Sequence, residues 1–109
     1  MLTRYCAKKL QDHEQVVINC EDNQGFVVHS IWLTNTHASN TTYTIRHVPK
    51  GQTSGSDFDL ASGVEITTNQ NVIYDSSTKI YLQPGDKLTA FAGNSERVSM
   101  FVYGNISNA

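Results

Sequence analysis

The feature that most constrains the fold is a series of short β-prone runs with no helical periodicity between them. Apolar residues spaced i, i+3 and i+4 do not persist over about ten residues anywhere in the chain. Instead, runs rich in Val, Ile, Thr, Tyr and Phe recur about every 10 residues, separated by polar turns. These predicted strands are 2–9, 15–20, 25–34, 41–48, 64–67, 71–74, 79–82, 87–92 and 97–104.

This pattern predicts an all-β protein, an antiparallel β-sandwich of about eight strands, either jelly-roll-like or immunoglobulin-like. A chain of 109 residues predicts a single domain spanning residues 1–109. The turn Pro84-Gly85-Asp86 fits this reading, because proline fixes the turn, glycine supplies a positive φ and the aspartate side chain accepts from the turn amides.

Two of the predicted strands are apolar on both faces, whereas strands of an isolated sandwich have one polar face. Strict alternation in 25–34 puts Phe26, Val28 and Trp32 on one side and Val27, Ile31 and Leu33 on the other. In 97–104, Val98, Met100 and Val102 oppose Phe101 and Tyr103. Either a loop covers the second face or another subunit meets it.

The segment 49–63 is the one long connection, and it holds three glycines and three serines. A loop of this length is usually disordered or functional. Phe58 and Leu60 within it favour partial docking, either on the second apolar face or on a partner.

Composition excludes several classes of function. Charged residues make up 17% of the chain and the net charge is −2, so no basic excess is present to bind nucleic acid. No apolar run approaches the roughly 18 residues of a membrane span. The first ten residues contain no secretory apolar region, so we expect Cys6 and Cys20 to be reduced thiols rather than a disulfide.

Candidate chemistry is sparse. If the polar turn at 35–40 closed a hairpin, His29 would face His47, but a metal site needs further ligands and no motif supplies them. Asp57 and Asp59 share a side of an extended segment, where solvated carboxylates are the expected reading. With no nucleophile motif either, we expect no enzyme, no metal and no cofactor.

Two stretches of the second half carry a resemblance to a known class. The segment IYLQPGDKLTAFA (80–92) is followed, after a short turn, by VSMFVYG (98–104). This resembles the closing hairpins of small β-sandwich virion proteins of tailed bacteriophages. The strands VVHSIWLTN (27–35) and TYTIRHV (42–48) look like the corresponding earlier strands. The insertion at 49–63 departs from the family pattern, in which the strands often follow each other directly.

The resemblance implies a structural component of the virion, assembled in the bacterial host cytoplasm. It implies a decoration or cement protein that stabilises the capsid by multivalent contacts, or else a neck, tail or baseplate accessory protein. The expected partners are other virion proteins, major capsid or tail proteins, and further copies of the chain in a homo-oligomer. We expect the contacts to come from the residues Leu2, Arg4, Trp32, Phe58, Leu60, Phe101 and Tyr103.

A carbohydrate- or receptor-binding module is the rival reading. Sugar sites use exposed aromatic rings with polar side chains beside them. The five tyrosines and the many Asn and Asp residues offer both types. Exposure of two or three tyrosines on one concave face would favour this reading.

Overall fold

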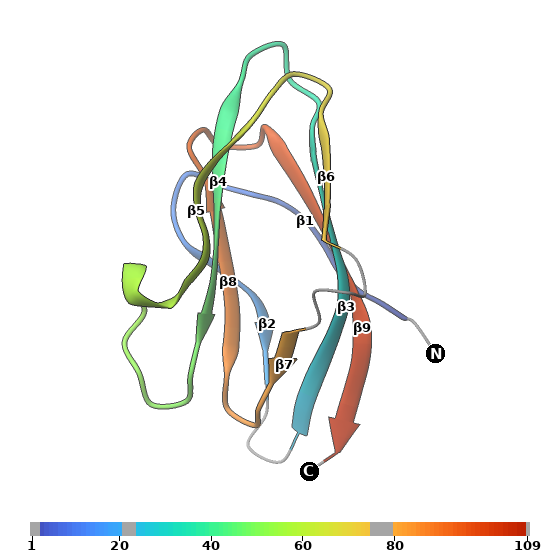
Figure 1. Cartoon of the computed structure of the whole chain (residues 1–109), viewed down its shortest axis with the longest axis vertical. Helices are drawn as coiled ribbons and strands as arrows, with labels where there is room; N and C mark the ends of the chain where they lie inside the picture. The colour runs from blue at the N-terminus through green and yellow to red at the C-terminus, as the bar shows by residue number, and fades with distance from the viewer. Residues whose placement is uncertain (1–2, 21–23, 75–79, 109) are drawn as a thin grey trace.

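The computed structural model describes residues 3–20, 24–74 and 80–108, with side chains for residues 7–20, 24–74 and 80–106. The described residues form nine strands in two layers, and one 3-10 turn, η1 (Ser56–Phe58), which lies to the left in Figure 1. The strands are β1 (Thr3–Lys9), β2 (Gln15–Asn19), β3 (Gln24–Asn35), β4 (Thr41–Val48), β5 (Asp59–Ile66), β6 (Asn71–Tyr74), β7 (Ile80–Leu82), β8 (Lys87–Ala92) and β9 (Val98–Asn108). No described helix is long and apolar enough to cross a membrane.

The strand order identifies the topology as a jelly roll. The first sheet has the order β1-β9-β3-β6, with β7 also paired to β3, and the second has the order β2-β8-β4-β5. All pairs are antiparallel. Because β6 and β7 pair with successive parts of β3, they count as two halves of one strand, and the resulting eight strands make two interlocked Greek keys. The predicted antiparallel sandwich is confirmed, and the order differs from the immunoglobulin one.

The turn at 35–40 joins the two sheets rather than two paired strands. β3 lies in the first sheet and β4 in the second, so His29 and His47 do not face each other. The hairpin considered from the sequence is therefore wrong. The physical reason is that apolar faces on both strands are buried better across the sandwich than side by side in one sheet.

The core lies between the sheets and is almost entirely aliphatic. β3 contributes Phe26, Val28, Ile31 and Leu33, all of them buried. A register shift between Val28 and Ser30 leaves one extra residue in β3, so the alternation changes phase there. The prediction that Phe26 and Val28 share a face with Trp32 is therefore wrong, since these two point inward and Trp32 points outward.

Gly104 is required where β9 crosses this bulge. It pairs with Val28, and a Cβ atom at this position would lie 2.1 Å from the carbonyl oxygen of Val27 and 2.6 Å from the Phe26 ring. A residue that has a Cβ atom therefore does not fit at this position. The glycine thus lets the Phe26 ring close this part of the core.

Asn35 hydrogen-bonds to the loops at the end of the sandwich where β3 ends. Its buried side chain donates to the carbonyl oxygens of Ser39 (2.9 Å) and Ile66 (3.0 Å) and accepts from the amide of His37 (2.9 Å). Its backbone also bonds to Asn69 and Gln70. One side chain therefore links the ends of β3 and β5 with the turn that follows β3.

The connection between β4 and β5 is shorter than the predicted 49–63. β5 begins at Asp59, and this early part pairs with β4 through Arg46 and Ile45 across register shifts. The remaining residues and η1 lie beside β4 on the second sheet. They do not cover the outer side of β3 and β9, so this interpretation of their second apolar face is wrong.

Candidate functional site

An uncovered row of apolar side chains crosses the outer side of the first sheet. Trp32 on β3 pairs with Ile73 on β6 and with Phe101 on β9, and Phe101 pairs in turn with Ala7 on β1. The flanking residues Ile31 and Leu33 are buried, which turns Trp32 and its row toward solvent. The row therefore spans four adjacent strands.

Two tyrosines extend this row along the sheet. Tyr103 lies one outward position from Phe101, and its ring meets that of Trp32 edge-on, with centroids 6.4 Å apart. Tyr81 pairs with Val27 farther along β3. Trp32 is 45% exposed, Ile73 49% and Tyr81 57%, whereas Phe101 and Tyr103 are half-buried. We call this outer surface of the first sheet the aromatic face.

The aromatic face has almost no charge. Its other outward residues, placed by the register, are Ala7, Lys9, Val27, His29, Ser30, Thr34, Asn71, Ser99 and Asn105. Among the described side chains it thus carries no carboxylate, and Lys9 at its border is the one lysine. His29 stands beside Asn105, 3.2 Å from its amide nitrogen.

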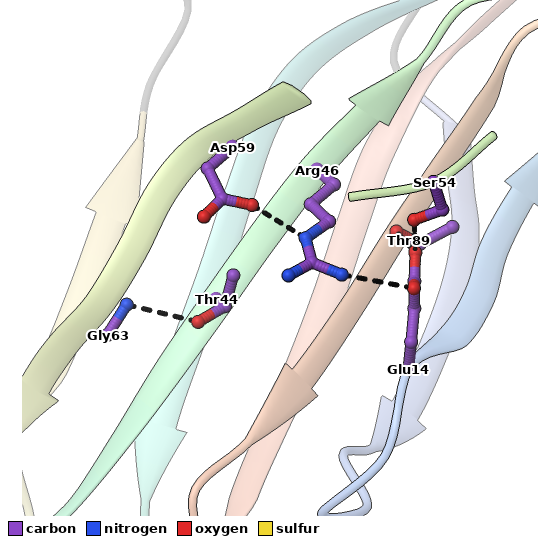
Figure 2. A network of polar contacts seen from close by, with 7 residues as sticks. All are labelled: Glu14, Thr44, Arg46, Ser54, Asp59, Gly63 and Thr89. Atoms are coloured by element: carbon purple, nitrogen blue, oxygen red, sulfur yellow. Dashed lines mark hydrogen bonds and ion pairs between the residues drawn. The ribbon is translucent and has the colours of Figure 1, made fainter. Parts of the chain in front are cut away.

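The outer side of the second sheet has the opposite character, as Figure 2 shows. Arg46 on β4 donates through Nε to Asp59 (2.6 Å) and through Nη1 to Glu14 (3.1 Å). Ser54 and Thr89 donate to the other oxygen of Glu14. We call this surface, with Lys87 at its end, the charged face.

The contacts of the charged face shift the pKa values of Glu14 and Arg46. Burial alone would raise the pKa of Glu14, but the hydroxyl donors and the Arg46 charge outweigh it and hold the pKa below its usual value. The hydrogen bond to Asp59 raises the pKa of Arg46, whose guanidinium also stands 5.0 Å from the centre of the Phe91 ring. This network joins the residue before β2, the strands β4, β5 and β8, and the β4–β5 connection.

Asp86 organises the opposite end of the sandwich, as the turn sequence predicted. Its carboxylate accepts from the amide of Gln83 (3.0 Å), the amide of Lys50 (3.0 Å) and Nε2 of His47 (2.8 Å). Gly85 has a φ of +90°. Burial would raise the pKa of Asp86, but these donors, His47 foremost, lower it overall. The Asp86 carboxylate thus connects the turn before β8 with the end of β4 and the residues that follow it.

A crevice of about 150 Å³ opens between β5 and the β6–β7 edge. It is lined by Ile31, Ile45, Leu60, Ala61, Tyr74 and Ile80. At its wall the hydroxyls of Tyr43 and Tyr74 bond to each other at 2.6 Å, and burial together with this bond raises the pKa of Tyr43. The lining offers apolar surface and no reactive group.

Within the described part of the chain, no three His, Cys, Asp or Glu side chains are placed to hold a metal ion. Asp57 and Asp59 do not form a pair, because Asp59 binds Arg46 while Asp57 lies exposed in η1. Cys20 is a free, buried thiol whose pKa is raised by burial and by the nearby Asp86 charge. The Cys6 side chain lies outside the described atoms.

Three of the residues predicted to make contacts meet on the aromatic face: Trp32, Phe101 and Tyr103. Phe58 and Leu60 lie elsewhere, beside β4 and at the crevice, where Leu60 is 51% exposed. Leu2 is outside the described residues, and Arg4 belongs to β1, opposite Tyr103, with its side chain not described. Residues 3–9 thus form the strand predicted at 2–9, paired with β9.

Sequence reasoning missed Ile73 and singled out Tyr81 only among the tyrosines in general. Both face outward because of their register with β3. A local sequence pattern does not contain that register, since the paired residues are about 40 to 55 positions apart.

No protein-family model and no curated protein matches the chain. Solved structures with a similar arrangement include a chain of the acid-stable capsid of Helicobacter pylori bacteriophage KHP30, with TM-score 0.48 and 9% identity, covering 100% of this chain and 98% of that one. The coat protein of Tobacco streak virus gives TM-score 0.48 and 9% identity, covering 99% and 85%. Eiger TNF from S. frugiperda gives 0.44 and 12%, covering 99% and 87%.

Proposed function

We propose that the chain is a structural component of a virus particle and acts by contacting other proteins rather than by catalysis. The observation that carries the proposal is the aromatic face, where Trp32 and Ile73 are about half exposed on a surface without described carboxylates. Soluble monomers seldom expose a contiguous apolar surface of this kind, and such surfaces usually mark interfaces. The jelly roll agrees with this role, although the same topology also serves lectins and cupins.

Within that class, the sequence resemblance supports a decoration or cement protein of a tailed bacteriophage. The bound partners are then major capsid or tail proteins, and assembly takes place in the host cytoplasm. A small subunit contributes little area to each contact. Many copies on one particle nevertheless stabilise it together, because each further contact forms at high effective concentration.

A second candidate, a carbohydrate- or receptor-binding module, is favoured by one observation. Tyr81 and Trp32 present exposed rings on the same side of the first sheet, with amide and hydroxyl side chains between them. Binding of the isolated protein to a glycan array, abolished by Tyr81→Ala, would support this candidate. Loss of array binding without loss of particle attachment would separate the two roles.

The test of the proposed function is the copy number of the chain in purified particles from its own source, measured by quantitative mass spectrometry. A copy number comparable with that of the major capsid protein supports a decoration role. A much smaller fixed number, confined to one end of the particle, supports the neck, tail or baseplate alternative. Absence of the chain from particles refutes the proposal.

A variant series then asks which surface holds the chain on the particle. Trp32→Lys changes the aromatic face and Leu60→Lys changes the exposed residue beside the crevice. Val16→Lys on the second sheet is the matched control, because Val16 is 45% exposed, as Trp32 is. We expect at least one of the first two changes to reduce particle occupancy tenfold and the control to leave it unchanged. Equal occupancy for all three refutes attachment through either surface.

A further inference from the structure

We propose that the aromatic face is the contact between two copies of this chain, packed sheet against sheet about a two-fold axis. In a two-fold contact the same patch meets itself, so the patch must be compatible with its own copy. The aromatic face meets this condition in charge, size and layout. This inference goes beyond the proposed function and does not depend on it.

Charge favours a second copy as the occupant. The described side chains of the aromatic face include no carboxylate. Its basic residues, Lys9 and, by its register position opposite Tyr103, Arg4, belong to the edge strand β1, so no like charges oppose each other in its interior. The charged face differs, because a second copy would bury the ion pairs of Arg46 with Glu14 and Asp59 at a desolvation cost. A neutral apolar surface is therefore the self-complementary one of the two outer faces.

The size of the face matches what a stable dimer needs. The strands β1, β9, β3, β6 and β7 have 7, 11, 12, 4 and 3 residues, and at about 3.3 Å rise and 4.8 Å spacing they give an outer surface on the order of 600 Å², at the lower end of the standard interface size. A standard interface buries about 800 Å² on each partner. Packing of two sheets face to face at about 10 Å is also how sandwiches bury their inner faces.

The layout places the aromatic anchors at the centre. Trp32 and Phe101 stand on β3 and β9, the two inner strands, and Tyr103 packs beside them. Polar residues surround this centre: Ser30, Thr34, Asn71, Ser99 and Asn105. Interfaces typically have such an aromatic core within a polar rim.

No described segment competes for the surface. The β4–β5 connection and η1 lie on the other side of the molecule, beside β4 (Figure 1). A dimer formed through the aromatic face thus leaves Leu60, which is 51% exposed, free for a different partner.

The chain contains a single tryptophan, so fluorescence excited selectively at tryptophan reports on Trp32 alone. The full chain is measured by sedimentation equilibrium and by tryptophan emission over a dilution series from micromolar to nanomolar concentration. We expect a mass of two chains at the high end. On dilution, the emission should shift to the red and become easier to quench with acrylamide, in step with the loss of mass.

Two variants and a control identify the surface. We expect Trp32→Lys, which removes the tryptophan and is followed by mass alone, and Ile73→Lys to raise the dissociation constant at least 100-fold. Val16→Lys, at an equally exposed position on the second sheet, should change it less than threefold. Thermal melting of each variant checks that it folds. If Trp32→Lys does not fold, Ile73→Lys on the short strand β6 tests the same surface.

Several results would overturn the inference. They are a monomer with concentration-independent emission, a trimer or other odd-numbered assembly, and a dimer that survives both lysine substitutions. The last result would indicate pairing through a strand edge instead. A dimer that behaves as expected in a chain absent from particles would leave this inference standing while refuting the proposed function.

Discussion

Replacement of Asn35 by alanine is expected to be the most damaging polar substitution in the described chain. The side chain is 0% exposed and makes three hydrogen bonds of 2.9–3.0 Å, to Ser39, Ile66 and His37. Alanine leaves two carbonyl oxygens and one amide without their partner, and each such buried group costs about 1–3 kcal/mol. His37 and Ser39 are themselves exposed, so water can replace part of the bonding that their backbone groups lose. The cost per group is therefore expected in the lower half of this range. The sum is about 3–5 kcal/mol of unfolding free energy.

Urea titration followed by circular dichroism measures this loss, and thermal melting gives a second reading. A domain of this size loses about 4 °C in melting temperature for each kcal/mol, so a fall of about 12–20 °C is expected. Asn71→Ala is the matched control, because Asn71 is exposed and its side chain accepts one bond, from Thr34. It should cost less than about 0.5 kcal/mol. Equal losses for the two variants would refute the reasoning that burial of the amide decides the cost.

Three further predictions concern stability. Gly104→Ala drives a methyl group against the Val27 carbonyl and should cost about 2 kcal/mol or more in a urea titration; an unchanged midpoint would contradict the close approach. Asp86 has a lowered pKa in the folded chain, so its stabilisation is present above the unfolded value of about 3.9 and is lost as pH falls through the folded one. The stability difference between the native chain and Asp86→Asn should therefore shrink below about pH 4, and a constant difference would show that the charge is irrelevant. Ala61→Leu should fill part of the apolar crevice and add about 1 kcal/mol, with a lower melting temperature as the opposing result.

The sequence predicted most strands because apolar alternation and turn chemistry agreed. The runs 41–48, 71–74 and 87–92 match β4, β6 and β8 at both ends. Gly93 and the Pro49 position end two of these strands by their own backbone preferences. Where local signals are this consistent, strand bounds need no tertiary information.

The predictions that were wrong concern features that depend on strand partners distant in sequence. β5 starts at Asp59 because that residue pairs with Arg46 across the sheet, although Ser62 and Gly63 within the strand are weak strand formers. The bulge in β3 reverses the facing of every residue after it, and a strict period of two cannot show where one extra residue is inserted. Both features are decided by tertiary pairing.

Some features of the candidate site could likewise be predicted from the sequence, and others could not. Trp32, Phe101 and Tyr103 could be named as candidate contact residues because they are aromatic residues on strands that are apolar on both sides. That they form one surface with Ile73 and Tyr81 follows from the register of four strands. The polar network of Glu14, Arg46 and Asp59 left no sequence motif at all, since its members come from three separate segments.

The strand order also limits how the chain folds as it is made. β9 pairs with β1 on one side and β3 on the other, and Thr3 meets Gly104 across almost the whole length of the chain. The middle of the first sheet is therefore the last of the nine strands to leave the ribosome. Until it arrives, β1 and β3 have no neighbour between them, and their edges remain open to other chains. Folding should be slow, as for proteins dominated by long-range pairing. A chain truncated before Val98 should aggregate rather than form half a sandwich.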